Sequence, residues 1–211
     1  MRLLLLGATG LAGSRTLALA LSSDAVSAVI APTRTPLTPH PKLVNPVESR
    51  LVDLLPAVAA SYELDAVICA LGTTQAIAGT KEAFLHVDYE LPVAFGKAAH
   101  AAGVETYAIV TAMGSSANSR FFYPRTKGEV ERDIRAIGFQ SLTICRPSLI
   151  GGERKETRRA EGAALKLARL LTPILPKKYR INPASSIAHA LLNAALASKP
   201  GCHWIGSEAM N

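Results

Sequence analysis

The 211-residue sequence predicts an α/β protein with a doubly wound parallel sheet of about seven strands and helices on both faces, as in a Rossmann fold. Short apolar runs alternate with longer helical stretches, and a glycine-rich turn follows the first run. A parallel strand that is buried on both faces reads as a continuous apolar run, which these segments match. Hydrophobic residues make up 49% of the chain, which is ample for one core.

The elements follow one another in a regular order. Strands are expected at 2–6, 26–31, 43–47, 65–70, 106–111, 142–146 and 202–205. Helices are expected at 11–22, 52–60, 81–102, 121–137, 162–171 and 184–197. Five prolines between Pro32 and Pro46 indicate an irregular connection rather than a linker. We therefore expect a single domain over 1–211, in which 147–200 forms a small elaboration on the substrate side.

The first stretch, LLLLGATGLAGS at 3–14, allows two interpretations. Arg2 supplies a positive start and Ala18-Leu19-Ala20 resembles a small-residue cleavage site, which is compatible with a secretion signal. Three glycines and Arg15 interrupt the apolar run, however, which favours a buried strand and a glycine turn. A helix that starts after such a turn directs free N–H groups and its positive dipole end at the turn, which suits a pyrophosphate.

Two further strand ends carry candidate binding residues. Arg34 lies 21 residues beyond Gly13, where an acidic residue would bind the ribose hydroxyl of NAD. Because no acid is present there, Arg34 favours the 2′-phosphate of NADP, although a plain surface arginine is the alternative. After the fourth strand, the sequence ALGTT at 70–74 offers a glycine for close backbone approach and two hydroxyls.

Tyr123 and Lys127 are spaced i, i+4 in the predicted helix after the fifth strand, so their side chains share one face. A free tyrosine is a poor proton exchanger near neutral pH, but a lysine ammonium one turn away favours the phenolate. The phenol could then exchange a proton with a substrate oxygen that Thr111 also holds. The spacing alone is common in helices.

The charge distribution is uneven. The net charge is +7, and residues 146–180 carry ten basic and three acidic side chains, so the excess lies there. A solvated helix and loop is the plainest interpretation; attraction of an anionic substrate or cofactor is the alternative. We also expect 151–169 to act as a mobile lid. Nucleic acid is not an expected partner, because Tyr179 is the segment's one aromatic residue.

The rest of the composition bears on membranes, metal sites and the cellular compartment. No apolar run approaches the roughly 18 residues that a membrane span needs, so no membrane partner is expected. The three cysteines are far apart, and no Cys/His cluster suggests a metal. Two cysteines lie in apolar stretches as small buried hydrophobes. We therefore predict a protein of the reducing cytoplasm.

Four motifs resemble the short-chain dehydrogenase/reductase superfamily, in its atypical branch, and within it the Tat-interacting-protein-like group. They are GATGLAG at 7–13, CALGTT at 69–74, FYPRTKGEVE at 122–131 and RPSLIGGERKETR at 146–158. The resemblance implies that cofactor-binding residues are Gly7, Thr9, Gly10, Leu11, Gly13, Arg34, Leu71, Gly72, Thr73, Pro147, Ser148 and Leu149. It implies Tyr123, Lys127 and Thr111 as the catalytic residues. The superfamily usually has serine where Thr111 stands, and Ser115 is the alternative.

The function implied is an NADP(H)-dependent oxidoreductase for a small carbonyl or hydroxyl substrate, with NAD(H) as the second choice of cofactor. A non-catalytic NADP(H)-binding redox sensor or regulatory interaction protein is the main alternative. A nucleotide-sugar epimerase is a weaker one, because such enzymes usually carry a larger substrate domain. The expected partner is a small molecule, and the expected state is a monomer or homodimer.

Overall fold

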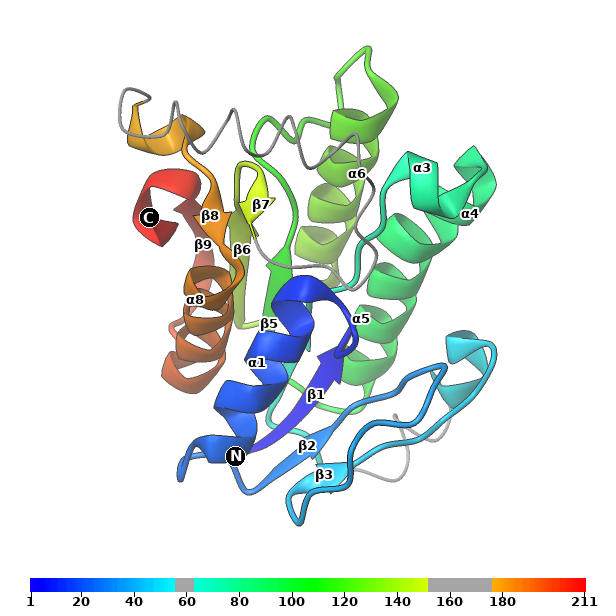
Figure 1. Cartoon of the computed structure of the whole chain (residues 1–211), viewed down its shortest axis with the longest axis vertical. Coiled ribbons are helices and arrows are strands. Elements are labelled where there is room, and N and C mark those ends of the chain that lie inside the picture. The colour runs from blue at the N-terminus through cyan, green and yellow to red at the C-terminus, as the bar shows by residue number, and fades with distance from the viewer. Residues whose placement is uncertain (56–62, 152–175) are drawn as a thin grey trace.

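The computed structural model describes residues 1–55, 63–151 and 176–211. Its centre is a seven-stranded sheet in the order β3-β2-β1-β4-β5-β6-β9, with every neighbouring pair parallel (Figure 1). The strands are β1 (Arg2–Leu6), β2 (Ala28–Ile30), β3 (Leu43–Val44), β4 (Ala66–Cys69), β5 (Thr106–Val110), β6 (Ser141–Arg146) and β9 (Gly201–Gly206). The predicted parallel α/β fold is confirmed.

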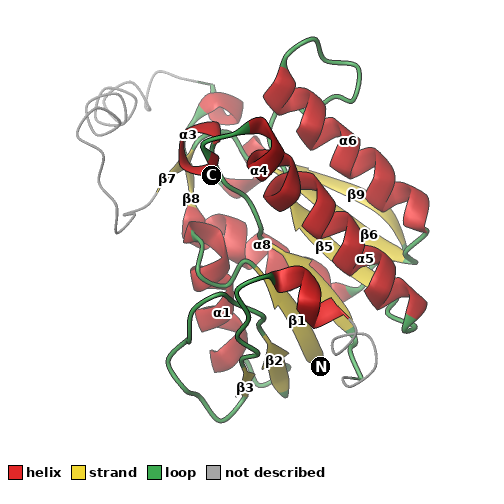
Figure 2. Cartoon of the chain, turned by 90° about the vertical axis from the view of Figure 1, so that its right-hand side faces the viewer, coloured by secondary structure: helices red, strands yellow, loops and turns green. Residues whose placement is uncertain are grey.

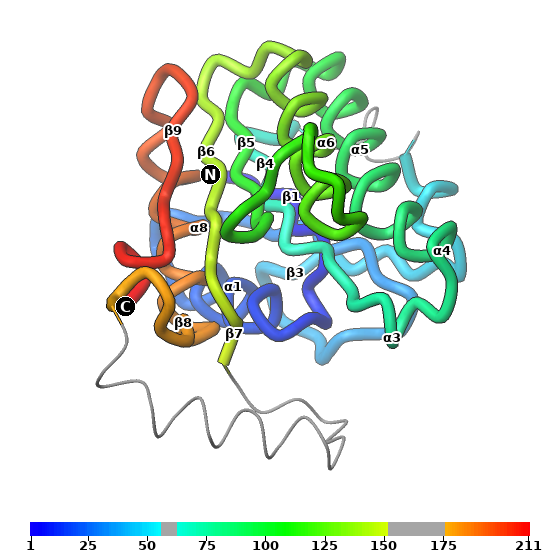
Figure 3. The backbone as a smooth tube through the Cα atoms, turned by 90° about the horizontal axis from the view of Figure 1, so that it is seen from above, coloured from blue at the N-terminus to red at the C-terminus, as the bar shows by residue number. Residues whose placement is uncertain are grey.

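Helices cover both faces of this sheet. Helices α1 (Leu11–Ser22) and α8 (Ala184–Ala197) pack on one face, and α5 (Leu91–Ala101) and α6 (Phe122–Ile137) pack on the other. Figure 2 shows α5 and α6 side by side over the strands, and Figure 3 shows the sheet between the two helical layers. The arrangement is doubly wound, as expected.

Strand β1 explains the opening run of leucines. Leu3 and Leu5 point into the core beneath α1 and α8, whereas Leu4 and Leu6 point into the core beneath α5 and α6. All four side chains are at most 1% exposed. Because successive side chains of a strand point to opposite faces, a strand between two covered faces must be apolar at every position. The strand interpretation of this run is confirmed.

The strand order changes direction next to β1. The chain first adds β2 and β3 on one side of β1, then crosses over to β4 on the other side. The segments that follow β1 and β4 therefore leave the sheet beside each other at its carboxyl edge. In sheets of this kind, ligands bind in the crevice at such a point.

The long helix expected at 81–102 is divided. The chain forms α4 (Lys81–Leu85), a π-helical turn (His86–Glu90) and then α5. Pro92 has no N–H to donate to the carbonyl four residues before it. The N–H of Leu91 donates to the carbonyl of His86, five residues back, which is the bond that defines a π turn. The widened turn contains the buried residue Asp88.

Several smaller elements were not predicted. A short helix, α3 (Gln75–Ala78), precedes α4, and a second sheet pairs β7 (Ile150–Gly151) with β8 (Asn182–Pro183) in parallel. A 3₁₀ turn, η3 (Lys177–Tyr179), precedes β8, and another, η4 (Ser207–Met210), follows β9. The first residues of the helix expected at 52–60 form a 3₁₀ turn, η1 (Leu51–Leu54).

Some predictions fall outside the described residues. These are the rest of the helix at 52–60, the helix at 162–171, and the lid at 151–169 except for Gly151. Within the described ranges, no helix is both long and apolar enough to cross a bilayer.

Candidate active site

The glycine turn between β1 and α1 is built so that two of its glycines cannot carry side chains. Gly7 has φ +82°, and a Cβ on it would lie 2.6 Å from the carbonyl oxygen of Ala70. A Cβ on Gly13 would lie 2.0 Å from the carbonyl oxygen of Gly7. The N–H of Gly10 closes the turn by donating to that same oxygen at 2.9 Å. The turn therefore packs tightly against both α1 and the segment after β4.

The N-terminus of α1 is open toward this turn. Its N-cap residue is Gly10, which has no side chain to accept a hydrogen bond from the first N–H groups. The first turn of the helix contains no acidic residue. Thr9 and Gly10 are exposed, and Leu11 is half-buried. An uncapped helix end with its positive dipole at an accessible glycine turn fits a pyrophosphate.

The segment after β4 lies beside the glycine turn. It contains the predicted residues Leu71, Gly72 and Thr73, and the contact between Gly7 and Ala70 joins the two segments. The backbone N–H of Thr73 donates to Oδ2 of Asp88 at 2.8 Å. Asp88 thus holds this segment at the crevice, a role that the sequence analysis did not assign to it.

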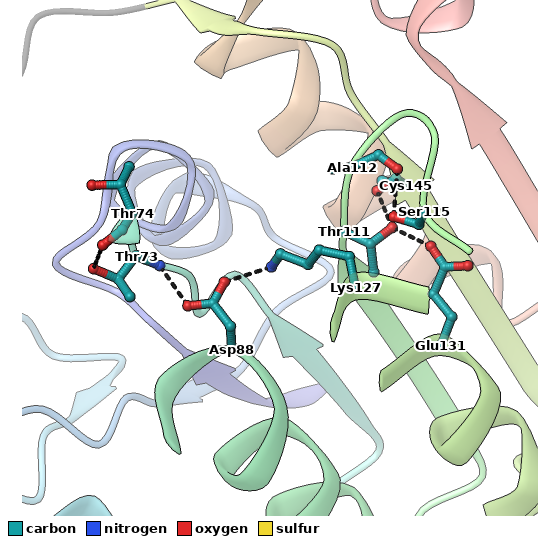
Figure 4. Close-up of polar contacts among 9 residues, drawn as sticks. All are labelled: Thr73, Thr74, Asp88, Thr111, Ala112, Ser115, Lys127, Glu131 and Cys145. Atoms are coloured by element: carbon teal, nitrogen blue, oxygen red, sulfur yellow. Dashed lines mark hydrogen bonds and ion pairs between the residues drawn. The ribbon is translucent and has the colours of Figure 1, made fainter. Parts of the chain in front are cut away.

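Asp88 also forms a buried ion pair with Lys127, as Figure 4 shows. Lys127 Nζ lies 2.8 Å from Asp88 Oδ1, and both residues are less than 5% exposed. A Cβ on Gly72 would lie 3.6 Å from Oδ1 and 3.8 Å from Nζ, so the pair lies next to Gly72. The charged end of Lys127 is therefore at the crevice between the two loops.

Burial by itself would lower the pKa of Lys127, because it disfavours the charged ammonium. The carboxylate of Asp88 acts in the opposite direction, with a smaller contribution from Tyr123, and the pKa of Lys127 ends above its ordinary value. Lys127 is therefore a fixed positive charge at neutral pH.

Tyr123 lies one turn before Lys127 on α6. Its side chain is 38% exposed, and its ring centroid lies 5.8 Å from that of Phe84 at the end of α4. The structure thus places a partly exposed phenol and a buried ammonium on one helix at the crevice. This is the arrangement that proton exchange with a bound substrate requires, and the catalytic roles of both residues stay predictions.

The hydroxyl of Thr111 is engaged elsewhere. It donates to Oε1 of Glu131 at 2.6 Å (Figure 4). Arg146 binds both carboxylate oxygens of Glu131. Thr111 is only 4% exposed. Ser115, the alternative, donates to the carbonyl oxygen of Ala112 at 2.6 Å. Neither proton is directed at the crevice, so the role of either residue in holding a substrate oxygen stays a prediction.

Arg34 lies in the loop after β2 with an exposed side chain. Thr33, beside it, is buried, and Asn45 Nδ2 donates to its hydroxyl at 2.8 Å and to the carbonyl of Ala31 at 2.6 Å. The amide of Asn45 also accepts from the N–H of Leu37. Asn45 therefore fixes the loop that carries Arg34, whose contact with a 2′-phosphate stays a prediction.

The segment of Pro147, Ser148 and Leu149 follows β6 at the same edge of the sheet. Its first carbonyl, that of Pro147, accepts from the N–H of Met113 at 2.7 Å, and the N–H of Ser148 donates to Oδ1 of Asn182 at 2.8 Å. The segment is thus tied to the loop after β5 on one side and to β8 on the other.

Burial keeps the thiols of Cys69 and Cys145 protonated. It raises the pKa of Cys69 to about 11 and that of Cys145 to about 12, so neither is a thiolate near neutral pH. The prediction that these two cysteines are buried hydrophobes is confirmed. The described residues contain no group of three or more His, Cys, Asp or Glu side chains that could hold a metal ion.

The sequence analysis missed three residues of this site: Asp88, Glu131 and Asn182. A signal existed for Glu131, because Tyr123, Lys127 and Glu131 follow one another at intervals of four along one face of α6. No such signal existed for Asp88, because the π turn interrupts the helical periodicity that would show which residues are buried. Asn182 lies next to residues 147–149 because β8 pairs with β7 in the second sheet, which was not predicted.

The fold and the glycine turn define a dinucleotide-binding Rossmann domain. Residues 7–169 match a family model described as NAD(P)H-binding, and the chain belongs to this family. The match and the fold together identify an NAD(P)H-binding protein, and solved structures that share its fold include a UDP-glucose 4-epimerase.

Curated fungal relatives extend over most of the chain. The chain is 37% identical to the mitochondrial protein fmp52 of Aspergillus clavatus over 214 residues, covering 97% of this chain and 91% of the relative. It is 39% identical to the mitochondrial protein FMP52 of Candida albicans over 159 residues, covering 72% of this chain and 69% of the relative. The cytoplasmic prediction is wrong, because these relatives are named as mitochondrial proteins.

Solved structures with the same fold hold NAD. MoeE5 in complex with UDP-glucose and NAD has a TM-score of 0.73 and 18% identity, and the match covers 98% of this chain and 76% of MoeE5. WbmH of Bordetella bronchiseptica in complex with NAD⁺ has a TM-score of 0.73 and 14% identity, with 98% and 75% covered. At these identities the likeness concerns the fold alone.

Proposed function

We propose that the protein is an NADP(H)-dependent oxidoreductase that acts on a small carbonyl or hydroxyl compound. The observation that carries the proposal is the pairing of partly exposed Tyr123 with buried Lys127 on α6, beside Gly72 at the strand crevice. The residues present fit the dinucleotide. Gly7 and Gly13 leave no room for side chains in the turn, and the end of α1 is uncapped. The nicotinamide, when bound, supplies or accepts the hydride.

The protein residues would handle the proton. In the direction of reduction, the hydroxyl of Tyr123 donates a proton to the carbonyl oxygen of the substrate, and in oxidation the phenolate takes it back. Asp88 holds the ammonium of Lys127 in place through the 2.8 Å ion pair, one helical turn after Tyr123. Pro147, Ser148 and Leu149 would line the nicotinamide side.

A panel of small aldehydes, ketones and alcohols tests this proposal, with NADPH, NADH and their oxidised forms as cofactors. We expect Tyr123→Phe to lower kcat/KM by at least about a hundredfold, as for loss of a general acid, with cofactor binding retained. Tyr179→Phe is the matched control, because Tyr179 is exposed and lies outside the site. Equal turnover by the Tyr123→Phe and wild-type proteins would contradict the assignment.

A non-catalytic NADP(H) sensor is the second candidate function. The observation that favours it is the hydroxyl of Thr111, which donates to Glu131 and so leaves Tyr123 and Lys127 without a described third donor. Tight cofactor binding with no turnover on any member of the panel would support the sensor. The epimerase interpretation rests only on fold neighbours such as the UDP-glucose 4-epimerase of Thermotoga maritima, which is 14% identical. Adding UDP-glucose to the panel tests it. A small-molecule partner, anionic in charge, and a monomer or homodimer remain our proposals.

Arg34 should set the choice of cofactor. If its guanidinium pairs with the 2′-phosphate, NADPH binds more tightly than NADH by about ten- to a hundredfold, the value of a charge-assisted pair. Arg34→Ala should remove most of this difference and leave NADH affinity nearly unchanged. Isothermal titration with both cofactors measures it, with Arg132→Ala as the control, since Arg132 is an exposed arginine on α6. Equal affinities for the two cofactors in the wild-type protein would refute the role.

A further inference from the structure

Residues 147–149 lie between two sheets and belong to neither. β6 ends at Arg146 in the main sheet, and β7 starts at Ile150 in the small one. The backbone groups of this three-residue segment are therefore held by bonds outside the regular ladders. One is the bond from the N–H of Met113 to the carbonyl of Pro147. The others come from Asn182.

Asn182 is fully buried, and its side-chain oxygen, its side-chain nitrogen and its backbone N–H all form hydrogen bonds. Its Oδ1 accepts from the N–H of Ser148 at 2.8 Å, and its backbone N–H donates to the carbonyl of Leu149 at 2.9 Å. Its Nδ2 donates to the carbonyl of Ser207 at 2.8 Å. A single side chain thus joins the segment after β6 to η4, two parts of the chain that are far apart in the sequence.

The hydroxyl of Ser148 strengthens the same attachment. It donates to the carbonyl of Arg180 and also lies 3.2 Å from Asn182 Oδ1. Arg180 directly follows η3, and Asn182 begins β8, which leads into α8. The backbone of Ser148 is therefore fixed from one side by two residues, while the neighbouring side chain of Leu149 is 55% exposed.

We propose that Asn182 is a positioning residue for the nicotinamide half of the dinucleotide. By fixing Ser148 and Leu149, it sets the wall against which the nicotinamide ring lies, whereas the glycine turn binds the pyrophosphate without it. The inference rests on the proposed function in one respect, namely that residues 147–149 face the nicotinamide. Asn182 itself touches no reacting atom in this arrangement.

Binding measurements separate this role from a general structural one. NADPH is compared with 2′-phospho-ADP-ribose, and NADH with ADP-ribose, so that both members of each pair carry the pyrophosphate and differ by the nicotinamide. We expect Asn182→Ala to weaken both complete dinucleotides by about tenfold, the loss of one buried hydrogen bond to the wall, and to change the affinity of the two fragments by less than about twofold. Asn193→Ala is the matched control, because Asn193 is an exposed asparagine on α8.

Three outcomes would overturn the proposal. They are equal weakening of dinucleotides and fragments, no change in either, or a wild-type protein that binds fragments as tightly as dinucleotides. If Asn182→Ala does not fold, Asn182→Ser gives the same test, since its hydroxyl keeps the site polar but is too short to reach Ser148. The readout needs no turnover. If the wild-type protein binds NADPH but reduces no substrate, and Asn182→Ala still shows the selective loss, the proposed function is refuted and this inference stands.

Discussion

Gly13→Val should weaken binding of NADPH and NADH by about a hundredfold or more. A Cβ at this position would lie 2.0 Å from the carbonyl oxygen of Gly7, so α1 or the turn must move. Overpacking of this kind costs about 1–3 kcal/mol in protein cores. The displaced groups here are the same N–H groups that would bind the pyrophosphate, so the effect on affinity should reach the upper end of that range or exceed it.

Fluorescence titration with each cofactor measures the effect, and circular dichroism checks the fold. Ala18→Val is the matched control, because it places the same side chain on an exposed position of α1. It should bind both cofactors as the wild-type protein does. Wild-type affinity in Gly13→Val would mean that the glycine turn does not hold the dinucleotide.

Asp88→Ala should lower the free energy of unfolding by about 3–5 kcal/mol, the usual cost of breaking a buried ion pair by removing one partner. It leaves Lys127, which is 4% exposed, without its counter-charge, and it leaves the N–H of Thr73 without its acceptor. Urea unfolding at pH 7 measures the loss. Glu90→Ala, on the same turn but exposed, is the control and should cost less than about 1 kcal/mol.

The pH dependence of the free energy of unfolding should show whether the unpaired Lys127 causes the loss in Asp88→Ala. In the wild-type protein the pKa of Lys127 is raised, so the stability it contributes is complete below about pH 10.4, the ordinary value for lysine, and is lost as the pH passes the raised pKa. Asp88→Ala removes the main contribution that opposes burial, so burial dominates and lowers the pKa of Lys127. The unfolded chain then binds more protons than the folded one, so the variant should gain stability between pH 7 and about pH 9.5. If the loss of stability in Asp88→Ala does not change with pH, Lys127 is not its cause.

The parts of the site that could be predicted are those whose geometry is local. The glycine turn and the Tyr123/Lys127 spacing are encoded within a dozen residues, and the order of strands and helices followed from apolar runs. Asp88 could not be found in this way, because the π turn before α5 changes which residues of the helix face inward.

Long-range contacts were equally hidden. Asn182 meets Ser148 across 34 residues of sequence, and no periodic pattern links the two positions. Glu131 lay in a visible pattern, but its pairing with Arg146 and Thr111 depends on the packing of α6 against β5 and β6. The cytoplasmic assignment rested on cysteine content, which reports redox conditions and not a compartment.

The four leucines of β1 have a consequence for how the strand finds its alignment. A shift of one residue would exchange the two cores, yet three of the four positions would still receive a leucine of the same volume, and only the position at one end would receive Arg2 or Gly7 instead. Side-chain packing, which normally specifies strand register, is therefore nearly degenerate within this run. The ends of the strand must select the correct alignment. At one end the N–H of Arg2 donates to Oδ2 of Asp65 at 2.6 Å, and at the other Gly7 fits against Ala70 because it has no Cβ. Gly7, which shapes the glycine turn, thus also helps to fix the register of the central strand.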